Sequence, residues 1–315
     1  MNPKYWYNTE KEVPMEHSLD VRIVKTTFSQ FLFSFFLIFI FFANESYSQC
    51  KPKSSVKDPA FDPCASERIA RPFPMRAVYV READVMWSKR VWRVIDLREK
   101  LNLPIYYPEE PTVCLMSLFD VLKCALLNDN LQAFANPIFD DEFTMPMTKE
   151  ELKNMLVTWD STHQSEDVNN PGEMINTPVK TEITARSIRQ YWIKEDWYFD
   201  KQRSVMEAKI VGICPLAEKI SESGEVVGVK PLFWIYFPDA RPFLANAAVF
   251  NRHNDAERMN YDELFVKRMF SSYVYKESNV YNRAISDYKT GLNVLLESEA
   301  IKEEIFDYEI DLWHY

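Results

Sequence analysis

The side chains best suited to acid–base chemistry are gathered in one polar stretch, Asn251 to Arg258. His253 stands there close to Asp255 and Glu257, and a histidine beside carboxylates can serve as a general base or bind a metal. The remaining histidines are His17, His163 and His314, and none has metal-ligand spacing to His253. We therefore favour a polar loop that caps the following helix over a catalytic or metal site.

Other residues that carry chemistry are present but lack the spacing that the chemistry needs. Asp140, Asp141 and Glu142 suit calcium by composition, yet they lack the ligand spacing of a calcium loop, so we expect a solvated turn. No GxSxG, GxxxxGK[ST] or GxGxxG pattern occurs, and the chain has only 5 glycines for phosphate-binding loops. We predict no catalytic residue, no cofactor and no metal, and hence no enzyme.

The composition is that of a folded acidic protein. Hydrophobic residues make up 47% of the chain and aromatic residues 15%, which is enough for a substantial core. The formal net charge of -10 argues against nucleic acid as the partner and against adhesion to anionic lipid, because both require a basic surface.

The N-terminal residues predict export across a bacterial inner membrane. Phe31 to Ala43 is an apolar run of 13 residues, interrupted by Ser34, with basic residues before it and small residues after it. As a helix it would reach about 20 Å, short of the roughly 30 Å hydrocarbon core, so we expect a signal peptide over residues 1–48. Translation from Met15 would give a more ordinary leader. The residues before Cys50 fit a lipidation site poorly, so we expect the mature protein in the periplasm.

Five cysteines leave an odd number for pairing: Cys50, Cys64, Cys114, Cys124 and Cys214. Export permits disulfides, and Cys50 with Cys64 is a candidate pair. Cys114 and Cys124 lie on an apolar stretch, so we expect them to be small buried hydrophobic residues. No CxxC motif supports structural zinc.

The first half of the mature chain begins with an extended segment. Residues 49–74 are rich in proline and lysine, which predicts a linker or a strap over a neighbouring subunit. Within 81–98, Trp87, Val91, Val94 and Arg98 have helical spacing, while 91–97 could also be a strand. Residues 104–108 are expected to be extended. Helices are predicted over 117–127, with Ser117 as N-cap, and after Thr148, which forms a capping box with Glu151.

The second half follows a polar linker, residues 161–180, and is rich in strands. Aromatic and β-branched residues over 196–199, 205–213 and 226–237 predict an antiparallel meander. A helix over 260–275 is predicted with Asn260 as N-cap. The tail over 291–315 forms an acidic amphipathic helix, which either packs on its own domain or docks on a partner.

A shift of 105 residues overlays part of the chain on itself. Over positions 81 to 105 six residues are identical, where average composition predicts roughly one or two. The matches are Arg81 with Arg186, Trp87 with Trp192, Lys89 with Lys194, Trp92 with Trp197, Arg98 with Arg203 and Ile105 with Ile210. We predict an α+β fold of two related modules in tandem, 75–160 and 181–290, the second with an inserted antiparallel hairpin. The exchange between Trp–Lys and Trp–Arg pairs also suggests cation–π contacts that position elements within each module.

Two stretches resemble a known family. Residues 81–100 with Tyr106-Tyr107-Pro108, and residues 251–282 with Lys267-Arg268-Met269-Phe270-Ser271-Ser272-Tyr273, are similar to the gliding motility proteins GldN and PorN. The resemblance covers roughly residues 70 to 285. It implies a periplasmic component of the type IX secretion system of Bacteroidota.

The resemblance also implies partners. Proteins of this family form a ring beneath the outer membrane with a lipoprotein, GldK or PorK, and the ring contacts the motor proteins GldL and GldM. Self-association within the ring follows, and no catalytic residues come with the family. Arg252 and Arg258 are candidate contacts to the ring partner. The alternative from the residues alone is a periplasmic glycan- or peptide-binding module built on exposed Trp and Tyr.

Overall fold

The computed structural model describes residues 73–112, 114–128, 131–160, 164–166, 174–176, 179–220, 226–252 and 259–312. All of these belong to one compact unit, Gln49–Tyr315. The signal peptide predicted over residues 1–48, its start at Met15, and the candidate pair Cys50 and Cys64 lie outside the described residues.

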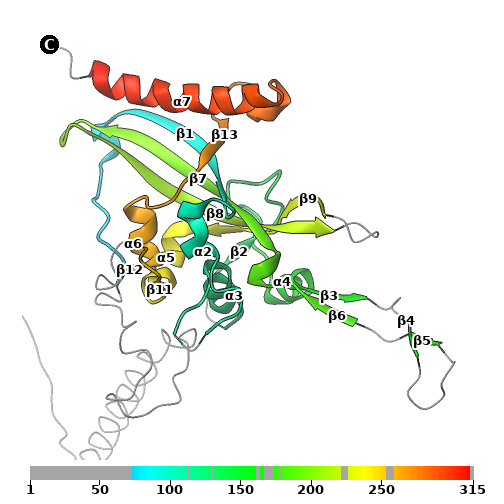
Figure 1. Cartoon of the computed structure of the whole chain (residues 1–315). Helices are drawn as coiled ribbons and strands as arrows, with labels where there is room; N and C mark the ends of the chain where they lie inside the picture. The colour runs from blue at the N-terminus through cyan, green and yellow to red at the C-terminus, as the bar shows by residue number, and fades with distance from the viewer. Residues whose placement is uncertain are drawn as a thin grey trace, which may run out of the picture. The chain divides into compact units, whose positions relative to one another are not determined.

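A seven-stranded antiparallel sheet organises the described part of the chain (Figure 1). The strand order is β13-β1-β7-β8-β10-β2, and the seventh strand, β9, pairs with β8. The strands are β1 (Val85–Asp96), β2 (Ala133–Phe134), β7 (Ile188–Asp200), β8 (Val205–Ile220), β9 (Val226–Pro231), β10 (Trp234–Tyr236) and β13 (Tyr273–Glu277). The predicted α+β class and the antiparallel meander in the second half are therefore confirmed.

The central pair of the sheet is β1 with β7. Their register runs from Val85 opposite Asp200 to Asp96 opposite Gln190. β-branched and aromatic residues along both strands favour this extended conformation. The strand alternative left open for residues 91–97 is thus correct, and the strand begins earlier, at Val85. A short 3-10 helix over Glu82–Asp84 precedes it.

Short helices cover one end of the sheet. They are α2 (Leu103–Tyr106), α3 (Leu118–Asn128), α4 (Lys149–Leu156), α5 (Phe237–Ala245) and α6 (Tyr261–Val266). α5 contacts α3, α6 and β8, so it lies at the centre of this layer. Buried Ile95, Ile193 and Ile213 of the sheet share one core with helix residues such as Phe119 and Phe265.

Three of these helices start at the capping residues that the sequence predicted. The Asp120 amide donates to Ser117 Oγ at 3.2 Å, ahead of α3. Thr148 and Glu151 form the predicted capping box of α4. The Glu263 amide donates to Asn260 Oδ1 at 2.7 Å, which satisfies a first-turn N–H group of α6.

The remaining described elements are small or lie at the C-terminus. Two-stranded ribbons join β3 (Val157–Asp160) with β6 (Val179–Glu182), β4 (Gln164–Glu166) with β5 (Met174–Asn176), and β11 (Ala248–Val249) with β12 (Met259–Asn260). Further 3-10 turns are Lys100–Asn102, Ala185–Ser187 and Ile285–Asp287. The predicted C-terminal helix is present as α7 (Leu292–Asp311), and it packs against β13.

Two predicted elements are wrong. The helix expected over Asn260–Tyr275 ends at Val266, because Tyr273–Glu277 pairs with β1 as strand β13. The extended piece expected over Pro104–Pro108 begins as helix α2, where Pro104 occupies the first turn. Proline is tolerated there because first-turn N–H groups have no partner within the helix.

The expectation for two cysteines is also wrong. Cys114 and Cys124 are both disulfide-bonded, and both side chains are only partly buried. They are therefore not the small buried hydrophobic residues that the apolar context suggested. Cys214 is the buried thiol of the described part, and burial raises its pKa, which makes it unreactive.

The self-similar stretches form the neighbouring strands β1 and β7. Trp92 faces Lys194 across the ladder, and Lys89 faces Trp197. Residues directly opposite each other share a face, so the matched lysines Lys89 and Lys194 lie on opposite faces of the sheet. Both predicted modules contribute strands to this one sheet. Their division into two tandem modules stays a prediction.

A loop between β2 and α4 packs against this sheet through Phe143. Its ring makes edge contacts with Phe134, Trp234 and Tyr236. Gly212 of β8 leaves room for the ring, since a Cβ there would lie 2.6 Å from Phe143 Cζ. The loop is held to the sheet by this close approach.

Gly212→Ala is expected to lower the free energy of unfolding by about 1–3 kcal/mol, as overpacking of a filled core does. Chemical denaturation of the purified protein measures this loss. Gly228→Ala is the matched control, because a Cβ at Gly228 meets nothing within 4 Å. Equal stability of the two variants would show that Phe143 does not pack against Gly212.

Candidate interaction surfaces

The polar stretch with the candidate partner contacts is described only in part. Arg252 is exposed and donates from Nη1 to the carbonyl oxygen of Lys100 at 2.7 Å. His253 and Arg258 lie outside the described residues. The structure thus places Arg252 at the surface beside the turn after β1, and the role of both arginines stays a prediction.

The acidic triplet at residues 140–142 holds its own loop together. Asp140 accepts hydrogen bonds from the Thr144 hydroxyl and from the amides of Glu142, Thr144 and Met145. These bonds, that of the Thr144 side chain first, lower the pKa of the Asp140 carboxyl. The Asp140 side chain thus stabilises the turn over residues 140–145. In the described part of the chain, no cluster of His, Cys, Asp and Glu is suited to a metal.

Lys194 on β7 is a buried cation, exposed by only 1%. Its Nζ donates to the carbonyl oxygen of Asp141 at 2.6 Å and lies 3.3 Å from Glu142 Oε1. The ammonium lies 5.8 Å from the ring centroid of Trp92 and 5.5 Å from that of Phe143. The lysine thus holds the loop against the sheet. Its cation–π contact with Trp92 joins the two predicted modules, whereas the expected contacts lay within each module.

The next residue, Glu195, is a fully buried anion on the opposite face of β7. Its Oε2 accepts hydrogen bonds from Arg268 Nη2 at 3.0 Å and from Trp197 Nε1 at 3.1 Å. The Arg268 guanidinium lies 5.1 Å from the Trp197 ring centroid. The pair joins the turn after α6 to the sheet, so its role is structural.

A second buried ion pair holds the start of the described chain. Asp262 of α6 is fully buried, and Arg241 of α5 binds both of its carboxylate oxygens, at 2.6 and 3.1 Å. The amide of Met75 donates to Asp262 Oδ2 at 2.7 Å, and Arg241 Nη2 donates to the Met75 carbonyl oxygen. The segment that enters β1 is therefore clamped to α5 and α6. No motif in the sequence indicated this contact.

Helix α7 presents apolar residues on two opposite sides. Ile301 and Ile305 are buried against Val91 and Val274 of the sheet. Lys89 reaches Glu304 at 2.9 Å, and Trp87 stacks on Tyr308 with ring centroids 4.8 Å apart. The opposite side carries exposed Leu292, Leu295, Leu296, Phe306 and Ile310. The helix thus packs on its own domain and still offers an outward apolar stripe.

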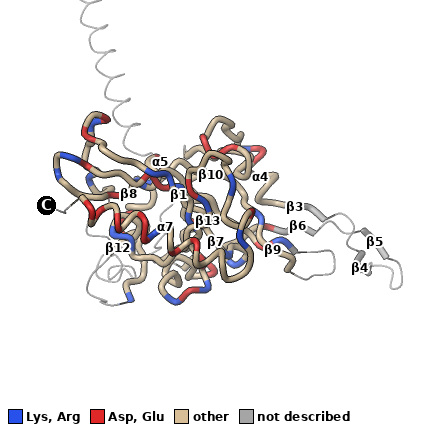
Figure 2. The backbone as a smooth tube through the Cα atoms, turned by 90° about the horizontal axis from the view of Figure 1, so that it is seen from above, with Lys and Arg blue, Asp and Glu red and all other residues tan. Residues whose placement is uncertain are grey.

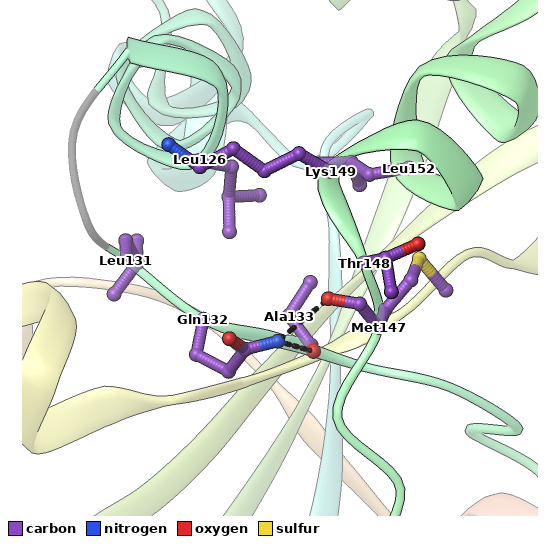
Figure 3. Close-up of a pocket in the computed structure, with 8 residues that line it drawn as sticks. All are labelled: Leu126, Leu131, Gln132, Ala133, Met147, Thr148, Lys149 and Leu152. Atoms are coloured by element: carbon purple, nitrogen blue, oxygen red, sulfur yellow. Dashed lines mark hydrogen bonds between the residues drawn. The ribbon is translucent and has the colours of Figure 1, made fainter.

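A pocket of about 270 Å³ lies between α3, α4 and the start of β2 (Figure 3). Leu126, Leu131, Ala133, Met147 and Leu152 supply its apolar wall, with Gln132, Thr148 and Lys149. Gln132 Nε2 donates to the carbonyl oxygens of Ala133 and Met147, at 2.8 and 2.7 Å. No aromatic side chain lines this pocket, so it differs from the aromatic pocket that the glycan-binding alternative requires.

The chain was also compared with known protein families. Residues 80–314 match the family described as "Gliding motility associated protein GldN". The chain belongs to the GldN family. The suspected resemblance is therefore confirmed, and membership associates the chain with gliding motility and type IX secretion. No curated protein matches the chain.

The GldN family match covers nearly every element described above. It extends from just before β1 to beyond the end of α7, including the tail that the resemblance covered less. GldN is a structural component of the motility machinery and not a known enzyme family. Among the described helices, none combines the length and apolar character needed to cross a membrane.

Proposed function

We propose that this GldN-family chain is a structural periplasmic component of the type IX secretion and gliding machinery. It forms a ring with an outer-membrane lipoprotein resembling GldK or PorK and contacts inner-membrane motor proteins resembling GldL and GldM. The observation that carries the proposal is the family match over residues 80–314.

The chemistry of the buried groups supports a structural role. Lys194, Glu195 and Asp262 are the kind of buried ionisable residue that often marks an active site. Each is instead bonded to a loop, a turn or the N-terminal segment, and none of the three opens into the pocket of Figure 3. The hydrogen bonds and ion pairs of these residues therefore stabilise the fold.

The cysteines support the proposed location. Disulfides persist in oxidising compartments such as the bacterial periplasm and are rare in the cytosol. The bonded state of Cys114 and Cys124 therefore suits an exported protein. An outer-membrane lipoprotein partner then provides the attachment to the membrane.

Affinity purification of the tagged chain from solubilised envelopes tests this function. The expected result is a large complex that contains the lipoprotein in a fixed ratio to the chain. Arg252→Glu with Arg258→Glu is expected to lower the yield of lipoprotein, and an unchanged yield would show that these arginines are not at the contact. Recovery of the wild-type chain alone would reject the proposed assembly.

A further inference from the structure

The outward side of α7 is an apolar stripe with no cover in the described part of the chain. Leu292, Leu296, Phe306 and Ile310 recur at helical spacing, and their exposed fractions are 71%, 59%, 60% and 42%. A helix of this kind normally hides one apolar side and exposes a polar one. α7 already buries Ile301 and Ile305 against the sheet, so the second stripe needs another explanation.

Acidic residues border and interrupt this stripe. Between Leu292 and Asp311 there are seven acidic residues and one lysine, a net charge of -6. Glu299 and Glu303 lie within the stripe itself, between Leu296 and Phe306, and both are exposed. Figure 2 shows the acidic positions along α7 in red. An occupant of this surface must therefore combine apolar side chains with positive charge.

The N-terminal segment of the same protein has the complementary character. Phe73, Val78 and Tyr79 are exposed, with Tyr79 at 86%. Arg76 lies between Phe73 and Val78 in the sequence, and Arg81 follows Tyr79. Both arginines are exposed, and neither makes an ion pair with a residue that the structure describes. From Gln49 to Arg81 the sequence holds seven basic and three acidic residues, a net charge of +4.

The two surfaces are kept apart within one copy. Arg241 and Asp262 hold Met75 beside α5 and α6. α7 lies across β1 and β13 (Figure 1). Its exposed stripe is on the side of the helix opposite Ile301 and Ile305, which are buried against the sheet. Residues 73–81 of a chain clamped in this way cannot cover the outward side of their own α7.

We propose that residues 73–81 of one copy lie along the outward stripe of α7 in a second copy. Phe73, Val78 and Tyr79 contact the leucines and Phe306, while Arg76 and Arg81 pair with Glu299 and Glu303. This contact joins two different surfaces, so each copy of a bound pair keeps its other surface free and the assembly grows into a ring or a filament. The inference rests on the proposed function and names the surfaces of its self-association.

Charge exchange in the compact unit Gln49–Tyr315 tests the contact. The helix variant carries Glu299→Lys and Glu303→Lys, and the segment variant carries Arg76→Glu and Arg81→Glu. Sedimentation velocity is expected to show association of the wild type at micromolar concentration and at least a tenfold weaker association of each variant alone. Mixing the two variants restores complementary charge at both contacts, so association is expected to return.

Control variants separate this contact from general charge effects. Glu110→Lys with Glu150→Lys makes the same change in net charge at exposed positions elsewhere and is expected to associate as the wild type does. Leu296→Ser with Phe306→Ser is expected to weaken association while circular dichroism and the melting temperature stay unchanged. High salt is expected to weaken the wild-type association, because the charged groups are exposed.

Three results would overturn the contact. They are a monomeric wild type, association that is unaffected by either charge exchange, and a mixture of the two variants that stays monomeric. Binding of the wild type to phosphatidylethanolamine–phosphatidylglycerol vesicles through Leu296 and Phe306 would also overturn it, in favour of a membrane. If the lipoprotein still co-purifies in these cases, the proposed function stands and only this contact fails.

Discussion

Replacing Arg241 with alanine is expected to lower the free energy of unfolding by about 3–5 kcal/mol, because a buried carboxylate then loses its partner. Asp262 is fully buried, and Arg241 binds both of its oxygens. The same change removes the bond from Arg241 to the Met75 carbonyl oxygen. Urea denaturation measures the loss of stability, and amide hydrogen exchange at Met75 and Arg76 measures release of the N-terminal segment.

An exposed ion pair supplies the control for this effect. Arg186 binds Glu109 at 2.8 Å, with exposed fractions of 69% and 30%. Water screens such surface pairs, so Arg186→Ala is expected to leave the free energy of unfolding almost unchanged. If Arg241→Ala and Arg186→Ala lowered the free energy of unfolding equally, Arg241 would not be needed to stabilise a buried charge on Asp262.

Arg268→Ala is expected to cost about 3–5 kcal/mol for the same physical reason at Glu195. Glu195 is fully buried, and its Oε1 accepts no hydrogen bond within the described residues. Removing the guanidinium leaves the carboxylate with the Trp197 indole as its remaining hydrogen-bond donor. Denaturant unfolding of the purified variant measures this loss.

Two further variants at this site separate charge from backbone strain. Arg268 has a φ of 54°, the left-handed conformation that often ends a helix and favours glycine. Arg268→Gly is therefore expected to cost less than Arg268→Ala. Adding Glu195→Gln to Arg268→Ala is expected to recover part of the loss, because the buried charge is gone. No recovery in the double variant would show that the ion pair is not the cause.

Local features of the fold were predictable from the sequence. Ser117, Thr148 and Asn260 cap helices because their side-chain oxygens accept from the amides three residues ahead. Aromatic and β-branched residues over 196–199 and 205–213 likewise indicated the end of β7 and the first part of β8. These signals act over a few residues, and the structure confirms them.

Contacts between distant residues were not predictable from the sequence. Arg241 and Asp262 lie on separate helices, and Glu195 and Arg268 are 73 positions apart. Nothing in a single sequence shows that the folded chain brings them together. The same reason explains the wrong helix over Asn260–Tyr275, since pairing of Tyr273–Glu277 with β1 prevails over local helical spacing.

Candidate functional surfaces were predictable only by their chemical type. The basic, proline-rich N-terminal segment and the acidic tail were both recognisable as partner surfaces. The sequence left open whether the tail packs on its own domain, and the structure shows that it does so with one side alone. Nothing in the sequence indicated the hydrogen bond from Met75 to Asp262, although this bond holds the chain ahead of β1 against α6.

The central claim is that this GldN-family chain works by binding other proteins, with its buried charges serving to fold it. The most direct measurement is the composition and mass of the complex that the tagged full chain forms in envelopes. The account predicts many copies of the chain together with the outer-membrane lipoprotein. A chain that stays monomeric in the presence of that lipoprotein would contradict the account.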